Sequence, residues 1–227
     1  MKLLDLDHYP RKDIYLAFRD RELPQLSVTA EVDITRLKAF LDETAYGFFL
    51  PMAYLAAVAA NRIPAFRERI VDGQLVEFEQ CLPSFTVTVE EGLFSFCDIQ
   101  RLGLFGEFYL HAKEVMHHIK KMPDLAVADK HGRLFITNIP WVSFTAFTHP
   151  YCKQYASIPI ISFGKFRQLN GTISLPVAVQ AHHALVDGYH LGQFFEILTA
   201  LCNDPASVLS TDLASVLSTD LASALST

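Results

Sequence analysis

The chain has few charged residues, few cysteines and a single tryptophan. Charged side chains account for 19% of its 227 residues, and four cysteines are scattered at positions 81, 97, 152 and 202. No two of them form a Cys-x-x-Cys pair, and a chain of this length can build a core without covalent cross-links. The sequence therefore predicts reduced thiols and a cytoplasmic location rather than a disulfide framework.

Long apolar runs and an excess of positive charge are also missing. The longest apolar stretch, Ala45 to Ala60, is interrupted by Pro51 and is shorter than the ~18–20 residues needed to cross a bilayer. Asp5 and Asp7 stand where a signal peptide would need apolar residues. The net charge of -6 argues against binding to a phosphate backbone. We therefore expect no membrane segment and no nucleic-acid partner.

Hydrophobic residues are abundant, at 51% of the chain, and 18 of them are phenylalanines. Such a composition excludes a disordered chain. It predicts a large apolar interior, a buried interface or an apolar pocket, and the length suits one domain or two small ones.

The hydrophobic pattern predicts strands interspersed with helices. Alternating or β-rich segments indicate strands at 26–32, 84–89, 134–137, 158–165 and 172–181. Helical periodicity indicates helices at 34–44, 49–61, 105–121 and 191–202. Asp72-Gly73 is typical of a hairpin turn, and Asn170-Gly171 is expected to join the last two strands in the same way. We predict one α+β domain over residues 1–204, with a mixed sheet covered by helices.

Residues 205–227 form a separate tail. The octapeptide Ala-Ser-Val-Leu-Ser-Thr-Asp-Leu at 206–213 recurs unchanged at 214–221, and a third copy begins at Ala222. Such a short unit cannot bury a core alone. We expect disorder or a product of repeat expansion, with docking as a helix as the alternative, and no catalytic role.

The densest chemistry lies between Gln180 and His190, after a predicted strand and before a predicted helix. His183 is the natural general base, because an imidazole titrates near working pH. Asp187 could orient the loop through an ion pair, and Gly188 suits a turn with unusual backbone angles. No serine in a Gly-x-Ser-x-Gly elbow competes as a nucleophile.

A metal site is the main alternative for these histidines. His182, His183 and His190 could supply three ligands, but adjacent side chains on a strand point in opposite directions. We therefore expect no metal, with His182 as a hydrogen-bonded core residue. A second cluster, on a helix, has no carboxylate at metalloprotease spacing and indicates a packed or solvated face. It consists of His111, His117 and His118.

The segment from His182 to Gly188 resembles the His-His-x-x-x-Asp-Gly motif of acyl-coenzyme A-dependent acyltransferases. An ordered set of further landmarks is similar to the chloramphenicol acetyltransferase family over residues 8 to 204. These landmarks lie at 10–13, 33–35, 45–46, 66–67, 72–76, 85–87, 140–144, 164–166 and 175–176. The resemblance implies a two-layer sandwich and acetyl-coenzyme A as a co-substrate, with no permanently bound cofactor.

The resemblance also implies roles for individual residues. His183 matches the base that takes the proton from the acceptor hydroxyl, and Asp187 matches a carboxylate that pairs with Arg11. Thr137, four residues before Trp141, stands where the family has a serine that stabilises the oxyanion. Ser162 stands where the family has a threonine that holds a water near that oxyanion.

Substrate contacts follow from the same resemblance. Phe18 and Phe147 match positions at the acceptor pocket, whereas Trp141 and Phe166 match aromatic positions near coenzyme A. The family is trimeric, with each site between two subunits. One pocket ring is replaced by Ala17, and an Asn-rich stretch is replaced by Thr148-His149-Pro150-Tyr151-Cys152-Lys153.

The resemblance predicts an O-acetyltransferase acting on chloramphenicol or a related hydrophobic alcohol, as in antibiotic resistance. Two alternatives stay open. One is a non-catalytic homologue that binds acyl-coenzyme A or an apolar ligand, and the other is an acyltransferase of the same superfamily with another acceptor.

Overall fold

The computed structural model describes residues 1–123 and 129–210. The predicted tail therefore lies outside the described residues from 211 onward. In its described part, Pro205 precedes a short helix, α6 (Ala206–Leu209), and Leu209 is buried in the main hydrophobic core.

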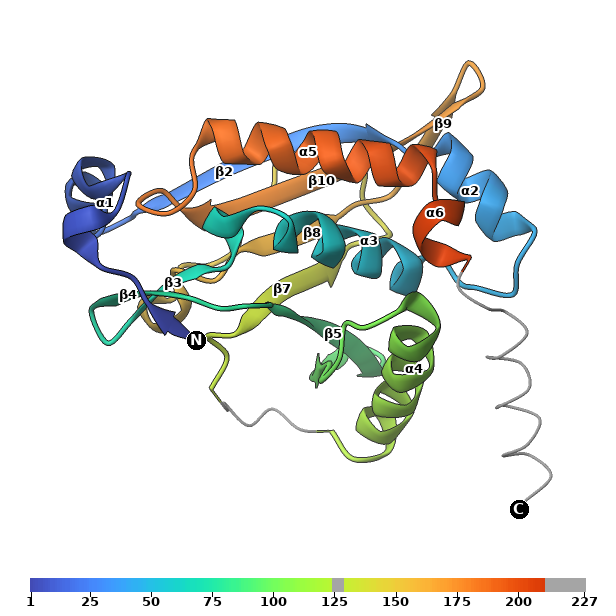
Figure 1. Cartoon of the computed structure of the whole chain (residues 1–227). Coiled ribbons are helices and arrows are strands. Elements are labelled where there is room, and N and C mark those ends of the chain that lie inside the picture. The colour runs from blue at the N-terminus through green and yellow to red at the C-terminus, as the bar shows by residue number, and fades with distance from the viewer. Residues whose placement is uncertain (124–128, 211–227) are drawn as a thin grey trace.

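A seven-stranded mixed sheet forms the centre of the fold (Figure 1). Its strands in spatial order are β2 (Gln25–Asp33), β10 (Thr172–His182), β8 (Ile160–Phe163), β7 (Arg133–Asn138), β5 (Leu82–Glu90) and β6 (Leu93–Asp98). A seventh strand, β9 (Arg167–Leu169), pairs with the start of β10. The β5–β7 and β7–β8 pairs are parallel and the others are antiparallel.

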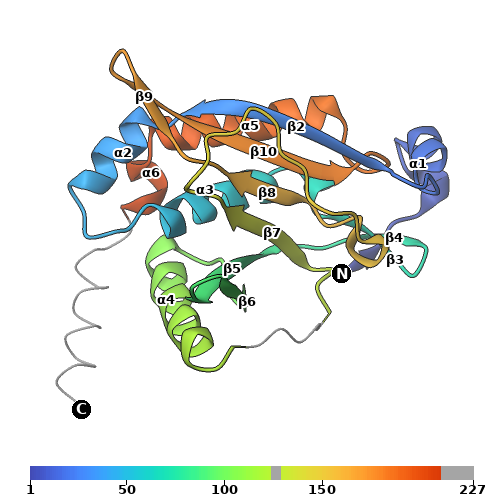
Figure 2. The ribbon, with the colours of Figure 1, turned by 180° about the vertical axis from the view of Figure 1, so that it is seen from behind.

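Helices cover one face of this sheet. They include α3 (Phe49–Asn61), α4 (Phe105–Lys121) and α5 (Gly188–Asn203), while α1 (Lys12–Phe18) and α2 (Thr35–Asp42) lie at the two ends of β2 (Figure 1). Among the described residues no α-helix covers the opposite face, which is crossed by the segment between β7 and β8, as Figure 2 shows. We call this second face the open face.

Strand periodicity separates the two faces chemically. On β7, Leu134 and Ile136 are buried in the core cluster that also contains nearly all of α3. Because successive side chains alternate, Phe135 and Thr137 point to the open face. Helix α3 is apolar on nearly all sides and is buried nearly all round, so it lies at the centre of the core.

A smaller three-stranded sheet flanks the N-terminus. It consists of β1 (Lys2–Leu3), β4 (Gln74–Glu77) and β3 (Glu68–Val71). The predicted Asp72-Gly73 turn joins β3 to β4. Both turn residues have positive φ, 50° and 77°, as a two-residue hairpin of this type requires.

The predicted α+β class with a mixed sheet covered by helices is confirmed. The predicted helices at 49–61 and 105–121 have the ends that the structure shows. One connection was wrong: Asn170-Gly171 joins β9 to β10, and β8 ends earlier, at Phe163. The reason is Pro176, which lies beyond the last paired position and has no N–H to continue the ladder with β8.

Candidate active site

The open face carries a row of small polar residues across the middle of the sheet. Thr137 on β7 and Ser162 on β8 are backbone partners in parallel strands, and Ser162 in turn partners Ala178 on β10. Side chains at partnered positions share a face, so the Thr137 and Ser162 hydroxyls stand side by side. Ser162 is 1% exposed, whereas Thr137 is half-buried.

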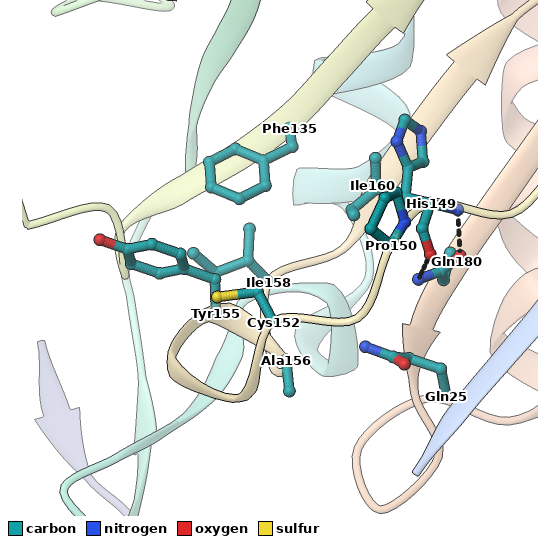
Figure 3. Close-up of a pocket in the computed structure, with 10 residues that line it drawn as sticks. All are labelled: Gln25, Phe135, His149, Pro150, Cys152, Tyr155, Ala156, Ile158, Ile160 and Gln180. Atoms are coloured by element: carbon teal, nitrogen blue, oxygen red, sulfur yellow. Dashed lines mark hydrogen bonds between the residues drawn. The ribbon is translucent and has the colours of Figure 1, made fainter. Parts of the chain in front are cut away.

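The crossing segment places His149 over this row. Its ring Nε2 lies 2.8 Å from the Ser162 hydroxyl, and its backbone N–H donates to Gln180 Oε1 at 2.9 Å. Figure 3 shows His149 beside Gln180, with the His149 ring next to Ile160. Burial lowers the pKa of His149, so its imidazole is neutral near pH 7.

Three hollows meet at His149. One of about 270 Å³ is lined by Thr137 and by apolar residues such as Phe135 and Ile160. A wider groove of about 1060 Å³ runs from Thr137 past Trp141 to the exposed rings of β6, Phe94 and Phe96. The third, of about 170 Å³, lies between Gln25, Cys152 and Tyr155 (Figure 3). Thr137 thus borders space for a small molecule, with apolar walls and few polar groups.

His183 lies elsewhere in the protomer, directly after the end of β10. Its backbone N–H donates to the Pro24 carbonyl at 2.7 Å, and its ring packs on Phe18 with 4.1 Å between centroids. Its Nδ1 is buried and has no hydrogen-bond partner among the described residues. The ring nitrogen left to meet a substrate is therefore Nε2.

Arg11 and Asp187 hold the loop that follows His183. Arg11 Nη2 lies 2.9 Å from Asp187 Oδ2, and Nη1 donates to the Leu185 carbonyl within the loop. Asp187 also caps α5 by accepting from the Tyr189 and His190 backbone N–H groups. Burial raises the pKa of Asp187, but the charges of His190 and Arg11 and the hydrogen bond from His190 hold it below its ordinary value. The structure thus joins Arg11, the histidine loop and α5 by charged hydrogen bonds.

His182 behaves as a core residue. It is 4% exposed, its Nδ1 accepts from the Ala184 N–H at 3.2 Å, and burial lowers its pKa to about 4. Within the described ranges no group of three His, Cys, Asp or Glu side chains could hold a metal. In the helix cluster, His117 and His118 are exposed and His111 accepts from the Gln100 N–H.

The expectation for Gly188 was wrong. It is the first residue of α5, its φ is not in the left-handed region, and an added Cβ would meet no atom within 4 Å. Asp187 itself makes the transition into the helix with extended backbone angles, so Gly188 carries no conformational requirement.

The aromatic positions lie in two places. Trp141 and Phe166 are 76% and 39% exposed, and their segments are tied by the Lys165 N–H donating to the Val142 carbonyl. Phe147 packs edge-on against His149, with 4.8 Å between ring centroids. Phe147 therefore lies beside His149, and Phe18 lies beside His183.

The two groups of candidate site residues are too far apart to contact a single reacting centre within one protomer. Ser162 is opposite Ala178, and His182 is four residues further along β10. At about 3.4 Å per residue, this is a separation of roughly 14 Å before His183 is reached. Thr137, one strand beyond Ser162, is farther still.

The same fold occurs in a solved acetyltransferase of low sequence identity. A solved dihydrolipoamide acetyltransferase from Azotobacter vinelandii superposes with a TM-score of 0.65 over 87% of this chain and 88% of that chain. At 18% identity, this likeness shows a common fold alone.

Closer similarities define the family. A family model described as chloramphenicol acetyltransferase matches residues 1–199. Chloramphenicol acetyltransferase 2 of Escherichia coli is 32% identical over 208 residues, covering 88% of this chain and 96% of that protein. The enzyme of Bacillus pumilus is 32% identical over 205 residues, covering 85% and 89%. A solved chloramphenicol acetyltransferase has a TM-score of 0.83 at 27% identity and covers 88% of this chain and 99% of that chain.

The chain belongs to the chloramphenicol acetyltransferase family, and it is an acyltransferase. The resemblance seen in the motifs is thereby confirmed. None of the helices in the described ranges is long and apolar enough to cross a membrane.

Sequence reasoning missed the place of His149 and Gln180 in the site. His149 lies in the segment that departs from the family pattern, and that departure was the available signal. Its contact with Ser162 could not be inferred, because it depends on how the crossing segment lies over the sheet.

Proposed function

We propose that this enzyme transfers acetyl from acetyl-coenzyme A to a hydroxyl of a hydrophobic small molecule, chloramphenicol or a related compound. Acetyl-coenzyme A serves as a co-substrate that departs as coenzyme A, and no cofactor stays bound. The names of the relatives and the apolar cavity beside Thr137 support this acceptor class.

In the proposed reaction, His183 Nε2 takes the proton from the acceptor hydroxyl. The oxygen attacks the thioester carbonyl directly, and the resulting tetrahedral oxyanion receives a hydrogen bond from the Thr137 hydroxyl. Collapse of the intermediate expels the coenzyme A sulfur, which takes the proton back from His183. Ser162, as the neighbour of Thr137, supports the oxyanion site, and Arg11 with Asp187 keeps the His183 loop in place.

The substrates would reach this centre from two sides. Phe18 and Phe147 would contact the acceptor, because each packs on a histidine of the site. Trp141 and Phe166 would contact coenzyme A, because both are exposed and Trp141 lines the groove that leads to Thr137.

The proposed assembly rests on one observation: within a single protomer, the proposed base and the proposed oxyanion donors are too far apart to contact the same tetrahedral centre. A catalytic unit therefore needs His183 from one subunit and Thr137 with Ser162 from another. The open face, which no α-helix covers in the described part of the chain, offers surface for such contacts (Figure 2). We propose a homotrimer, closed as cyclic oligomers are, and a cytoplasmic location.

The test is release of the coenzyme A thiol from acetyl-coenzyme A with chloramphenicol and a panel of other alcohols. We expect acceptor-dependent release with at least one hydrophobic alcohol. A folded oligomer that releases no thiol with any acceptor would contradict the proposal. Calorimetric binding of acyl-coenzyme A without turnover would instead support a non-catalytic binding protein.

A further inference from the structure

His149 is a half-buried, neutral imidazole in the acceptor cavity and has no role in the reaction derived above. It lines the cavity beside Thr137 and both neighbouring hollows. The surface of this cavity is mostly apolar, with Phe135 and Ile160 among its walls, and Lys130 and Tyr155 add further polar side chains. A polar side chain in such a wall discriminates between ligands more strongly than an apolar one, because a partner that cannot pair with it leaves a buried polar atom unsatisfied.

The ring is held in one orientation from several sides. Ser162 contacts Nε2 at 2.8 Å, and Phe147 packs edge-on against the ring. Gln180 fixes the backbone by accepting from the His149 N–H at 2.9 Å and donating to the His149 carbonyl at 3.5 Å. Binding groups that are held in place before the ligand arrives lose little entropy on binding.

Only one polar atom of the side chain remains for a ligand. Among the described residues, the hydrogen bond that the ring makes is the one from Nε2 to Ser162, and it leaves Nδ1 available. In a neutral imidazole, one nitrogen donates and the other accepts. Nδ1 can therefore pair with either a donor or an acceptor of the ligand, and the Ser162 hydroxyl can rotate to suit the tautomer.

We propose that His149 determines acceptor specificity by hydrogen-bonding, through Nδ1, a polar group of the acceptor other than the hydroxyl that reacts. This inference rests on the proposed acetyl transfer and names the substrate class of that site more closely. The preferred acceptors are hydrophobic alcohols that carry a second hydrogen-bonding group. Plain hydrophobic alcohols are poorer substrates.

The test compares two probe acceptors: chloramphenicol, which has a second hydroxyl and an amide, and 3-phenylpropan-1-ol, which has only the reacting hydroxyl. The quantity measured is the ratio of their kcat/KM values, with the KM for acetyl-coenzyme A as an internal control. Three variants are compared with the parent enzyme. His149→Leu removes both ring nitrogens, His149→Asn keeps an amide near the Nδ1 position, and His149→Gln keeps one near the Nε2 position.

We expect His149→Leu to lower the ratio about tenfold, mainly through the KM for chloramphenicol, with the KM for acetyl-coenzyme A within twofold of the parent value. His149→Asn should restore part of the ratio and His149→Gln should not. A ratio that is unchanged in His149→Leu would overturn the proposal. A ratio that only His149→Gln restores would also overturn it, because the role would then belong to the Nε2 contact with Ser162. Failure of the parent enzyme with every alcohol would refute the acetyl transfer itself, and the inference with it.

Discussion

Thr137 and Ser162 are paired positions on the neighbouring parallel strands β7 and β8, so their hydroxyls stand together on the open face of the sheet. The family pattern has serine and threonine at these positions in the opposite order. The exchange keeps one hydroxyl at each position, and the strand register keeps the two hydroxyls adjacent. The proposed oxyanion site therefore depends on the rotamer of Thr137, which a β-branched side chain restricts.

Removing the Thr137 hydroxyl should slow the chemical step. We expect Thr137→Ala to lower kcat about 10²–10³-fold, as loss of one oxyanion donor does, with little change in either KM. Thr137→Ser should retain at least the parent kcat, because serine reaches the same rotamer more easily. Steady-state kinetics with the best acceptor decides, and a Thr137→Ala enzyme within a few fold of the parent would remove Thr137 from the mechanism.

Loss of the base should have a larger effect. His183→Ala is expected to lower kcat by about 10²–10⁴-fold or more, because proton transfer from the acceptor hydroxyl no longer has a positioned base. The unfolding midpoint should change little, since His183 Nδ1 makes no hydrogen bond among the described residues. Residual activity close to that of the parent would show that another group is the base.

The Arg11–Asp187 pair should contribute to stability more than to chemistry. Asp187→Asn keeps an acceptor that can cap α5 but removes the charge, so it isolates the ion pair. We expect a loss of about 1–3 kcal/mol in the free energy of unfolding, typical of a partly buried charged hydrogen bond. A double-mutant cycle with Arg11→Gln, measured by urea unfolding, gives the coupling. A coupling near zero would mean that the pair does not stabilise the loop.

His182 makes stability depend on pH. The pKa of His182 in the folded chain is lowered to about 4. Between pH 6.5 and 4, this side chain is therefore protonated in the unfolded chain but neutral in the folded chain. The free energy of unfolding should therefore fall as the pH decreases from about 6.5 to 4, by up to roughly 1.4 kcal/mol per pH unit from this group. His182→Asn should reduce the slope between pH 7 and 5 in urea titrations. An identical slope in parent and variant would indicate that His182 is protonated in the folded state.

Much of the fold could be predicted from the sequence because its signals are local. The apolar run of 49–61 and the amphipathic period of 105–121 predicted two helices whose ends agree with the observed ends. Strand β6 was missed because it inverts the usual alternation: Ser95 and Cys97 are buried, whereas the rings of Phe94 and Phe96 are exposed. Helix α1 was missed because it buries only Tyr15, too little for a periodic pattern.

The site could be predicted only where the family motif carries it. His183, Asp187, Arg11 and Thr137 came from matching motif positions, and the structure brings Arg11 to Asp187 across 176 positions of sequence. His149 has no motif. Its place over Ser162 is set by a crossing segment, which no local rule predicts.

The proposed mechanism requires His183 and Thr137 to act across a subunit boundary. The most direct test mixes two inactive variants, His183→Ala and Thr137→Ala, by unfolding them together and refolding them. If each site uses one residue from each subunit, about a quarter of the interfaces in a random equal mixture combine an intact His183 with an intact Thr137. We predict that coenzyme A release rises to roughly a quarter of the parent rate. Activity that stays at the sum of the two separate variants, in a mixture shown to contain mixed oligomers, would contradict the claim.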